Sequence, residues 1–181
     1  MKPKSRARWK IKAGVLFLFA LNAPVLLAQS ACVPPLLNAS LGKQFEGWHV
    51  VDVSDLRVDD QHIWRARNVG NCPGITSGHF ESSAREMIAI SLYKSRANGA
   101  YLQMLLVADE HGGHYKLTVL SPPQDVAYLG VISKWPPGIY SSVTDKKLDI
   151  RLDSIEYEAI EAGSLLFFYD NGSFHSEVVV Q

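Results

Sequence analysis

Three short turn signals, each lying between apolar runs, constrain the fold of this chain more than any other feature. They are Asn98-Gly99, His111-Gly112-Gly113-His114 and Asn171-Gly172. Asn-Gly and Gly-Gly supply the positive φ angles that two-residue hairpin turns require. Strands joined by such turns are antiparallel neighbours, so the turns predict an antiparallel β-protein.

Short runs rich in β-branched and aromatic residues predict about eight or nine strands, arranged as an antiparallel sheet or sandwich. After Pro34-Pro35, apolar residues at 36, 37, 41 and 45 have the spacing of one short N-terminal helix with a buried face. The fold class is therefore mainly β, with that helix packed on the sheet. The predicted strands are 48–53, 62–67, 86–93, 101–107, 115–120, 127–132, 147–152, 165–169 and 174–180, and the proline-rich 134–140 should be a stiff loop.

The first thirty residues have the three parts of a secretory signal. Six basic residues and no acidic ones occur before position 13, an apolar stretch covers 14–28, and small residues follow. A membrane-spanning helix needs about 20 largely apolar residues, whereas this stretch is shorter and contains an asparagine and a proline. We therefore predict a signal peptide over 1–30, a single exported domain over 31–181, and no stable membrane span after cleavage.

The exact cleavage site and a lipid anchor are separate questions. Cleavage after Ser30 leaves small residues at the expected positions, and cleavage after Ala28 is the alternative. Cys32 lies just beyond, but the residues before it do not match the box that precedes a lipidated cysteine. A periplasmic or secreted protein is thus favoured over a lipoprotein.

Cys32 and Cys72 are the only cysteines of the chain. Because an exported protein meets an oxidising environment, we predict a structural disulfide between them. Closing this loop would stabilise the fold by about 4 kcal/mol in the chain-entropy account. The alternative, a free catalytic cysteine, would need a neighbouring base such as His79, and no motif of fixed spacing supports it.

Charge excludes one class of partner. The whole chain has 18 Lys+Arg and 18 Asp+Glu, but 31–181 holds 12 basic and 18 acidic residues, a net charge of −6. An acidic domain is repelled by phosphate backbones and anionic lipid surfaces. We therefore expect no nucleic-acid partner.

No serine-hydrolase elbow, zinc-protease motif or phosphate-binding glycine loop is present in the sequence. Asp109, His111 and His114 are the best metal candidates, because a hairpin turn could bring together ligand types that Zn²⁺ or Cu²⁺ accept. A solvated turn tip is the simpler interpretation, so we expect no metal and no cofactor. Glu156 and Glu158 would share one face of a strand, but acidic surface residues are favoured over a catalytic pair.

Two segments are candidate partner-binding surfaces. Trp135 lies in the proline-rich loop, where an aromatic side chain can anchor a partner or else fix its own loop to the body. Ser77, Gly78, His79 and Phe80 form the other candidate, an exposed turn.

The segment from Cys72 also carries a resemblance to a known group of proteins. CPGITSGHFESSAREMIAISLY, followed later by YKLTVL and SLLFFYDNGSFHSEVVV, resembles small secreted bacterial proteins of unknown function with a degenerate FG-GAP/VCBS-type element. The matching positions are Cys72, Pro73, Gly74, Gly78, Phe80 and Ala89. His79, Ser83 and Met87 stand where the element's calcium loop has aspartates, and Glu81 alone keeps a carboxylate, so calcium should not bind. The resemblance implies a secreted β-protein without assigning an activity.

Ser77-Gly78-His79-Phe80 is also similar to a Ser-Gly-x-Tyr-like loop that some periplasmic lysozyme inhibitors insert into the enzyme cleft, although Phe80 lacks the tyrosine hydroxyl. Three hypotheses follow. The favoured one is a non-enzymatic binding domain of the periplasm or envelope, with an envelope or secreted protein as its partner. The alternatives are an inhibitor or immunity-like factor against a hydrolase, and a small secreted hydrolase with an unrecognised site.

Overall fold

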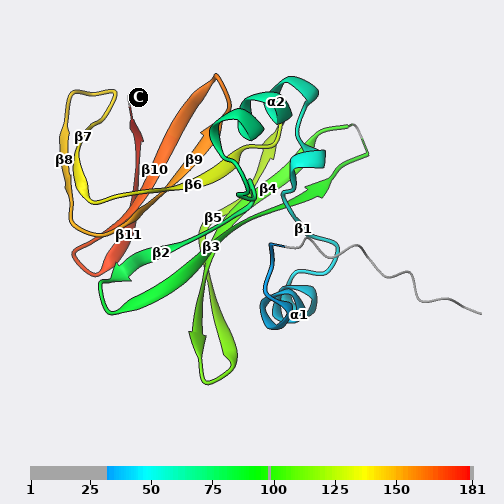
Figure 1. The fold of residues 1–181 in the computed structure, drawn as a ribbon, viewed down its shortest axis with the longest axis horizontal. Helices are drawn as coiled ribbons and strands as arrows, with labels where there is room; N and C mark the ends of the chain where they lie inside the picture. Colours follow the sequence, from blue (N-terminus) through cyan, green and yellow to red (C-terminus); the bar gives the residue numbers. More distant parts are fainter. Residues whose placement is uncertain (1–31, 98, 180–181) are drawn as a thin grey trace, which may run out of the picture.

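The computed structural model describes residues 32–97 and 99–179, and the predicted signal peptide lies outside this part of the chain. The described residues form a mainly β fold of eleven strands in antiparallel sheets of five, four and two strands, with two α-helices (Figure 1). No helix among them is long and apolar enough to cross a membrane. The predicted fold class is confirmed, with more strands than expected and a second helix.

The strands and helices have these bounds. The five-stranded sheet contains β1 (His49–Val50), β2 (Ile75–Ser82), β3 (Arg85–Ser95), β4 (Tyr101–His111) and β5 (His114–Val126). The four-stranded sheet contains β6 (Val131–Trp135), β9 (Ser154–Ala159), β10 (Gly163–Asp170) and β11 (Ser173–Val179). The hairpin of β7 (Gly138–Ser141) and β8 (Lys147–Ile150) is separate, and the helices are α1 (Pro35–Gln44), the 3₁₀ turn η1 (Val53–Asp55) and α2 (Val58–Arg67).

The predicted turns lie where the sequence places them. Gly112 and Gly113 have φ angles of 57° and 80° between β4 and β5. Asn171 and Gly172 have φ angles of 49° and 85° between β10 and β11. Two successive positive φ angles give the turn that suits the twist of a two-residue hairpin. The third signal includes Asn98, which lies outside the described residues.

Several predicted boundaries are wrong. The run 62–67 is not a strand but the second half of α2, which has acidic Asp59 and Asp60 in its first turn and basic Arg65 and Arg67 in its last. These charges complement the helix dipole and outweigh the weak strand propensity of the run. The predicted loop over 134–140 contains the end of β6 and most of β7, and strands β2 and β9 were not predicted as strands.

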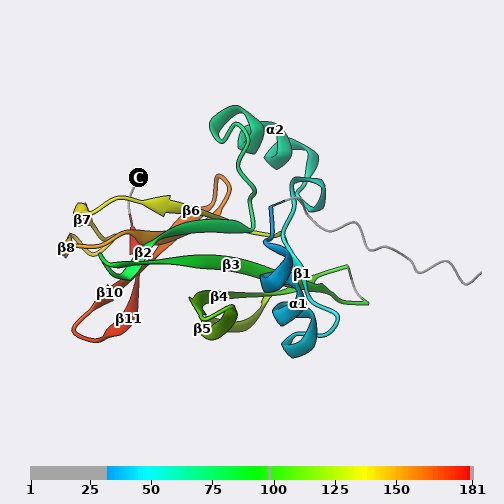
Figure 2. The same cartoon turned by 60° about the horizontal axis from the view of Figure 1, so that its bottom comes forward.

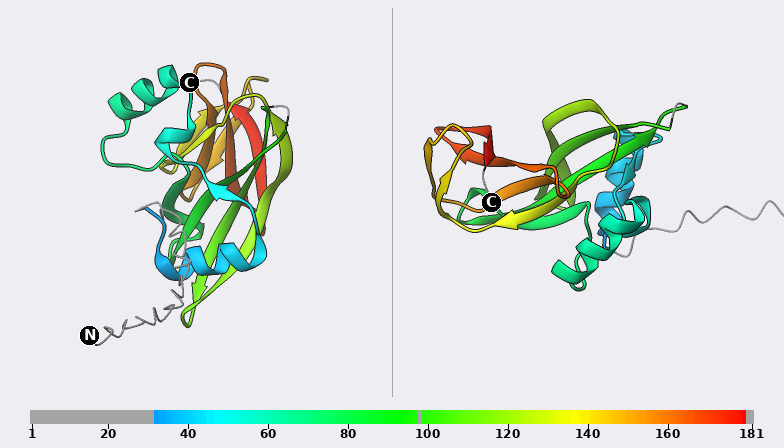
Figure 3. Two further views of the ribbon diagram at one scale, coloured as in Figure 1. Left: turned by 90° about the vertical axis from the view of Figure 1, so that its right-hand side faces the viewer. Right: turned by 90° about the horizontal axis from the view of Figure 1, so that it is seen from above.

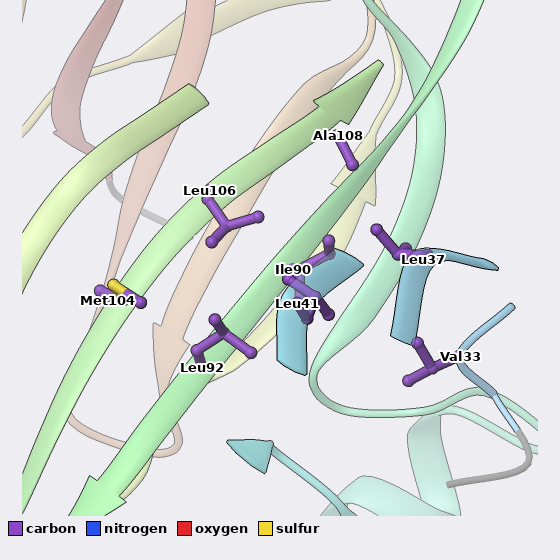
Figure 4. Close-up of a cluster of buried hydrophobic side chains, with 8 residues drawn as sticks. All are labelled: Val33, Leu37, Leu41, Ile90, Leu92, Met104, Leu106 and Ala108. Atoms are coloured by element: carbon purple, nitrogen blue, oxygen red, sulfur yellow. The ribbon is translucent and has the colours of Figure 1, made fainter. Parts of the chain in front are cut away.

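Two hydrophobic clusters lie on opposite faces of the five-stranded sheet, and smaller clusters form beside α2 and at the β7–β8 hairpin. On the outer face α1 places Leu37 and Leu41 against alternate residues of β3 and β4 (Figure 4). On the inner face the five-stranded and four-stranded sheets pack together through Phe80, Met87, Ala89, Leu105, Val107, Ile132, Ile155 and Phe167. Because β3 and β4 are covered on both faces, their sequences are nearly continuous apolar runs rather than alternating ones.

The predicted disulfide is confirmed. Cys32 and Cys72 are bonded, with their Cα atoms 6.2 Å apart. The bond joins the segment before α1 to the loop between α2 and β2. It therefore holds the segment before α1 close to the start of β2.

A buried polar network centred on Gln103 joins the two sheets. The Gln103 side-chain amide donates to Ser91 Oγ (2.8 Å) and to the Gly130 carbonyl (2.7 Å). Its oxygen accepts from the Gly130 N–H (2.9 Å) and from the Tyr157 hydroxyl (2.8 Å). A Cβ atom at Gly130 would lie 2.4 Å from Tyr157 Cζ, so only glycine fits this approach.

We expect Tyr157 to make stability fall in alkaline solution. Burial raises the pKa of Tyr157 to about 12. The folded-state pKa of Tyr157 lies above its unfolded value. The contribution of the neutral side chain to the free energy of unfolding is therefore complete below about pH 10 and is lost as the pH rises towards 12. Between pH 9 and pH 11 the wild type should lose about 1 kcal/mol more of its free energy of unfolding than Tyr157→Phe. Urea unfolding of both proteins at the two pH values measures the difference, and equal losses would contradict the assignment.

Candidate functional site

A recess of about 750 Å³ lies where strands β2 and β6 come together. Figures 1 and 2 show these two strands side by side, with α2 over one end of the pair. The floor comes from both strands and from β3, and the wall comes from the disulfide and the loop after α2. The lining residues are Cys32, Pro34, Trp64, Asn68, Gly70, Asn71, Cys72, Ile75, Thr76, Ser77, Ile88, Ile132, Ser133 and Lys134.

The two strands belong to different sheets, and one hydrogen bond lies at each end of their contact. At one end the Ile132 N–H donates to the Pro73 carbonyl (2.7 Å). At the other end the His79 N–H donates to the Asp153 carboxylate (2.9 Å). Among residues 32–97 and 99–179, no backbone hydrogen bond runs between β2 and β6 themselves. The recess therefore lies along a contact between two sheets in which β2 and β6 are not paired. We call this contact the seam.

Gly78 keeps the closed end of this seam compact. A Cβ atom there would lie 2.9 Å from Lys134 Cδ and 3.0 Å from Asp153 Oδ2. Any side chain at position 78 would push Lys134 or Asp153 away from β2. The glycine is therefore required by close approach rather than by a turn.

A second recess of about 450 Å³ continues the first under α2. Trp64, Asn68 and Ser133 line both, and the second is completed by Arg67, Trp135, Glu156 and Glu158. We call the two recesses together the β2–β6 groove. Figure 3 shows, from above, α2 beside the strands of the four-stranded sheet that carry these residues.

Two carboxylates lie side by side at the α2 end of the groove. Glu156 is 5% exposed and accepts hydrogen bonds from Ser133 Oγ (2.8 Å) and Trp135 Nε1 (2.8 Å). Glu158 accepts from Arg67 at 3.3 Å. Burial and the neighbouring Glu156 charge raise the pKa of Glu158, and Arg67 opposes the shift. The interpretation of this pair as surface residues is wrong for Glu156, which is buried.

The segment Ser77–Phe80 is part of strand β2 and not an exposed turn. Its residues alternate, so Ser77 and His79 are exposed while Gly78 and Phe80 point inward. Phe80 is 0% exposed and lies at the centre of the inner core. Phe80 therefore cannot contact a partner, and only the outward half of this candidate remains.

Trp135 is held by the protein itself. Its ring centroid lies 4.9 Å from that of Tyr140, and its indole N–H binds Glu156. The ring is half-buried against the β7–β8 hairpin and also lines the groove. Of the two roles predicted for Trp135, fixing its own loop is the one that these contacts describe.

The candidate metal ligands are only partly brought together. Asp109 is 6% exposed and lies 2.7 Å from His111 Nε2, and Arg85 Nη1 lies 3.0 Å from the same carboxylate oxygen. His114 is the cross-strand partner of His111, at the other side of the turn. The Arg85 guanidinium supplies the cation at this carboxylate. No group of three or more His, Cys, Asp or Glu side chains suited to a metal occurs among residues 32–97 and 99–179.

The groove unites segments that the sequence analysis treated separately. Ser77 of β2 and Lys134 of β6 line the first recess, and Trp135 of β6 lines the second. Asn68, Asn71 and Ser133 were missed, because nothing in their local sequence marks them as neighbours of one recess. The spacing of Glu156 and Glu158 was the one available signal for its acidic end.

No protein-family model, curated protein or solved structure matches this chain. The resemblance to secreted proteins with an FG-GAP/VCBS-type element stays a prediction from the sequence.

Proposed function

We propose that this protein is an exported, non-enzymatic binding domain whose partner, an envelope or secreted protein, docks in the β2–β6 groove. One observation carries the proposal: Ser77, from the outward half of Ser77–Phe80, and Trp135, at the end of β6, line the two recesses of one groove. Two candidate binding segments, far apart in the chain, thus form one surface. A groove of this size with mixed polar and apolar walls is typical of binding sites.

Export to the periplasm or beyond is part of the proposal. It rests on the three-part N-terminal signal in the sequence and agrees with the Cys32–Cys72 disulfide. The acidic balance of 31–181 favours a partner that is neutral or basic over an anionic one.

The inhibitor hypothesis needs a different form from the one suggested by the sequence. Inhibition by an inserted loop would require a protruding Ser-Gly-x-aromatic segment. Here Gly78 and Phe80 are buried residues of strand β2. An inhibitor or immunity-like factor of this fold would have to hold its target through the groove.

A hydrolase is the second candidate, and the Glu156–Glu158 pair favours it. Residues two apart on a strand have Cα atoms about 6–7 Å apart on one face, a spacing compatible with paired carboxylates of glycoside hydrolases. The raised pKa of Glu158 suits an acid, while Glu156, held by two neutral donors, suits a base. If the protein is a hydrolase, it should hydrolyse a glycoside, and Glu158→Gln should abolish that hydrolysis. Such activity would replace the binding proposal.

Blocking the groove should abolish partner capture. Asn71 is exposed on the groove wall, so Asn71→Trp fills the recess without removing a core side chain. Thr118→Trp adds the same bulk to an exposed position of β5, away from the groove. Wild type and both variants, purified from the periplasm after export, serve as baits in periplasmic extract, and captured proteins are identified by mass spectrometry.

We expect one defined protein that wild type and Thr118→Trp capture equally and that Asn71→Trp captures at least tenfold less. Capture that Asn71→Trp leaves unchanged would place the interface elsewhere. Failure of all three baits to capture a protein would remove the binding proposal.

A further inference from the structure

We propose that a cavity between the two large sheets binds a small neutral apolar molecule of the size of phenol, whose hydroxyl lies at the cavity mouth. The cavity has a volume of about 100 Å³ and is bordered by β4 and β5 of one sheet and by β9 and β10 of the other. It shares no lining residue with the β2–β6 groove, so this inference does not depend on the proposed function. The lining residues are Gln103, Met104, Leu105, Ser121, Gln124, Val126, Tyr157, Leu165 and Phe167.

An irregular stretch of β5 forms one wall of the cavity. Ser121 pairs with Leu105 of β4, and the next pair, Gln124 with Gln103, lies two residues along β4 but three residues along β5. The extra residue belongs to a bulge that contains Pro122-Pro123, where the missing N–H groups cost no ladder bond. A bulge bends its strand and increases the local twist. Because Ser121 and Gln124 flank this bulge and both line the cavity, the space follows from the local sequence of β5.

The interior of the cavity is apolar and uncharged. Leu105 and Phe167 are buried, and Leu165 of β10 is the cross-strand partner of Tyr157 of β9. The Tyr157 hydroxyl donates to Gln103, whose side chain makes three further hydrogen bonds within the protein. All nine lining side chains are uncharged. The interior therefore favours an apolar group, and a charged ligand would lose its hydration there without compensation.

The mouth of the cavity is polar. Gln124 is exposed and Ser121 is half-buried, and Gln124 Nε2 donates to Ser121 Oγ at 3.3 Å. A hydrogen bond at the surface can be exchanged for one to a ligand at little cost in free energy. Binding sites for small molecules commonly combine apolar walls with a few polar groups that orient the ligand. The mouth therefore suits a neutral hydroxyl on an apolar body.

The volume of the cavity limits the size of the ligand. Apolar cavities of about 150 Å³ stay dry and take up benzene. A cavity of about 100 Å³ that opens at a mouth has room for one six-membered ring, whereas two fused rings exceed it. A bound water needs two to four polar partners, and here the exposed polar side chains lie at the mouth. A single apolar ring should therefore replace any water in the interior.

The probe is phenol, titrated into exported, oxidised protein that carries ¹³C-labelled leucine and valine methyl groups. Phenol should cause saturable shifts of the methyl signals of Leu105, Val126 and Leu165, which line the cavity. The signals of Leu37 and Leu41 should stay unchanged, because α1 lies on the opposite face of the five-stranded sheet. In the same assay 2-naphthol, which has two fused rings, and glycerol, which has no apolar body, should bind at least tenfold more weakly than phenol.

Variants that change the size of the cavity test its role directly. Ser121→Leu fills the mouth and should weaken phenol binding at least tenfold. Ser95→Leu makes the same change at an exposed position of β3 outside the lining and should leave binding within twofold. Leu165→Ala enlarges the cavity and should bind 2-naphthol at least tenfold more tightly than the wild type does. Circular dichroism shows whether each variant is folded, and Ser121→Leu decides the test if Leu165→Ala does not fold.

Three results would overturn this inference: no saturable shift with phenol, unchanged phenol binding by Ser121→Leu, or binding of 2-naphthol to the wild type as tight as that of phenol. The groove is tested separately. Asn71→Trp should bind phenol within twofold of wild type, because position 71 lies in the groove and not in the cavity lining. Failure of partner capture would therefore reject the proposed function and leave the cavity site in place, and the reverse also holds.

Discussion

Replacing Gln103 with leucine should destabilise the protein by about 3–5 kcal/mol, although the substitution conserves volume and removes a polar side chain from the core. Gln103 is 3% exposed and makes four hydrogen bonds, two to the backbone of Gly130 and one each to Ser91 and Tyr157. Leucine removes the side-chain partner of both Gly130 backbone groups and the acceptor of the Tyr157 hydroxyl. Each buried polar group left unpaired costs about 1–3 kcal/mol.

Gln124 provides a matched control, because it is the cross-strand neighbour of Gln103 in β5 and is exposed. Gln124→Leu should change the free energy of unfolding by less than about 0.5 kcal/mol. Urea unfolding monitored by tryptophan fluorescence measures both. A Gln103→Leu protein as stable as the control would mean that the network contributes nothing to joining the sheets.

The Gln103 network also shows where prediction from sequence ends. The turn signals at 111–114 and 171–172 determine which strands are neighbours, because they involve only adjacent residues. The apolar runs of β3 and β4 likewise predict buried strands. A glutamine inside the run YLQMLLV signals a buried polar group, but its partners are remote in sequence: Gly130 lies in the loop before β6 and Tyr157 in β9 of the other sheet.

For the candidate site, too, local spacing could be interpreted from the sequence, whereas contacts between distant segments could not. The i, i+2 spacing of Glu156 and Glu158 predicts a shared face, and the structure places both in the groove. The seam between β2 and β6 arises from the packing of two sheets, and no local pattern encodes it. The run 62–67 was misassigned because a short amphipathic helix with few apolar residues and a β-branched, aromatic run look alike over six positions.

Replacing Phe80 with alanine should lower the free energy of unfolding by about 3–5 kcal/mol, the usual cost of an emptied aromatic site in a core. Phe80 is fully buried and packs against side chains from both sheets, including Met87, Ile132 and Phe167. Phe80→Leu, which fills most of the space, should lose less than half as much. Urea unfolding of both variants and of the wild type measures these differences in the free energy of unfolding.

The same variant separates stability from recognition. Phe80 lies in the same strand as Ser77, with its side chain on the buried face, whereas Ser77 lines the groove. A role of Phe80 in contacting a partner and a role in the core therefore predict opposite results. If Phe80 acts through the core, Phe80→Leu should bind a captured partner within threefold of wild type while unfolding at lower urea concentration. If it contacted a partner, affinity would fall with stability unchanged. The buried position of the ring requires the first outcome, and the proposed docking surface on β2 would then consist of outward side chains such as Ser77.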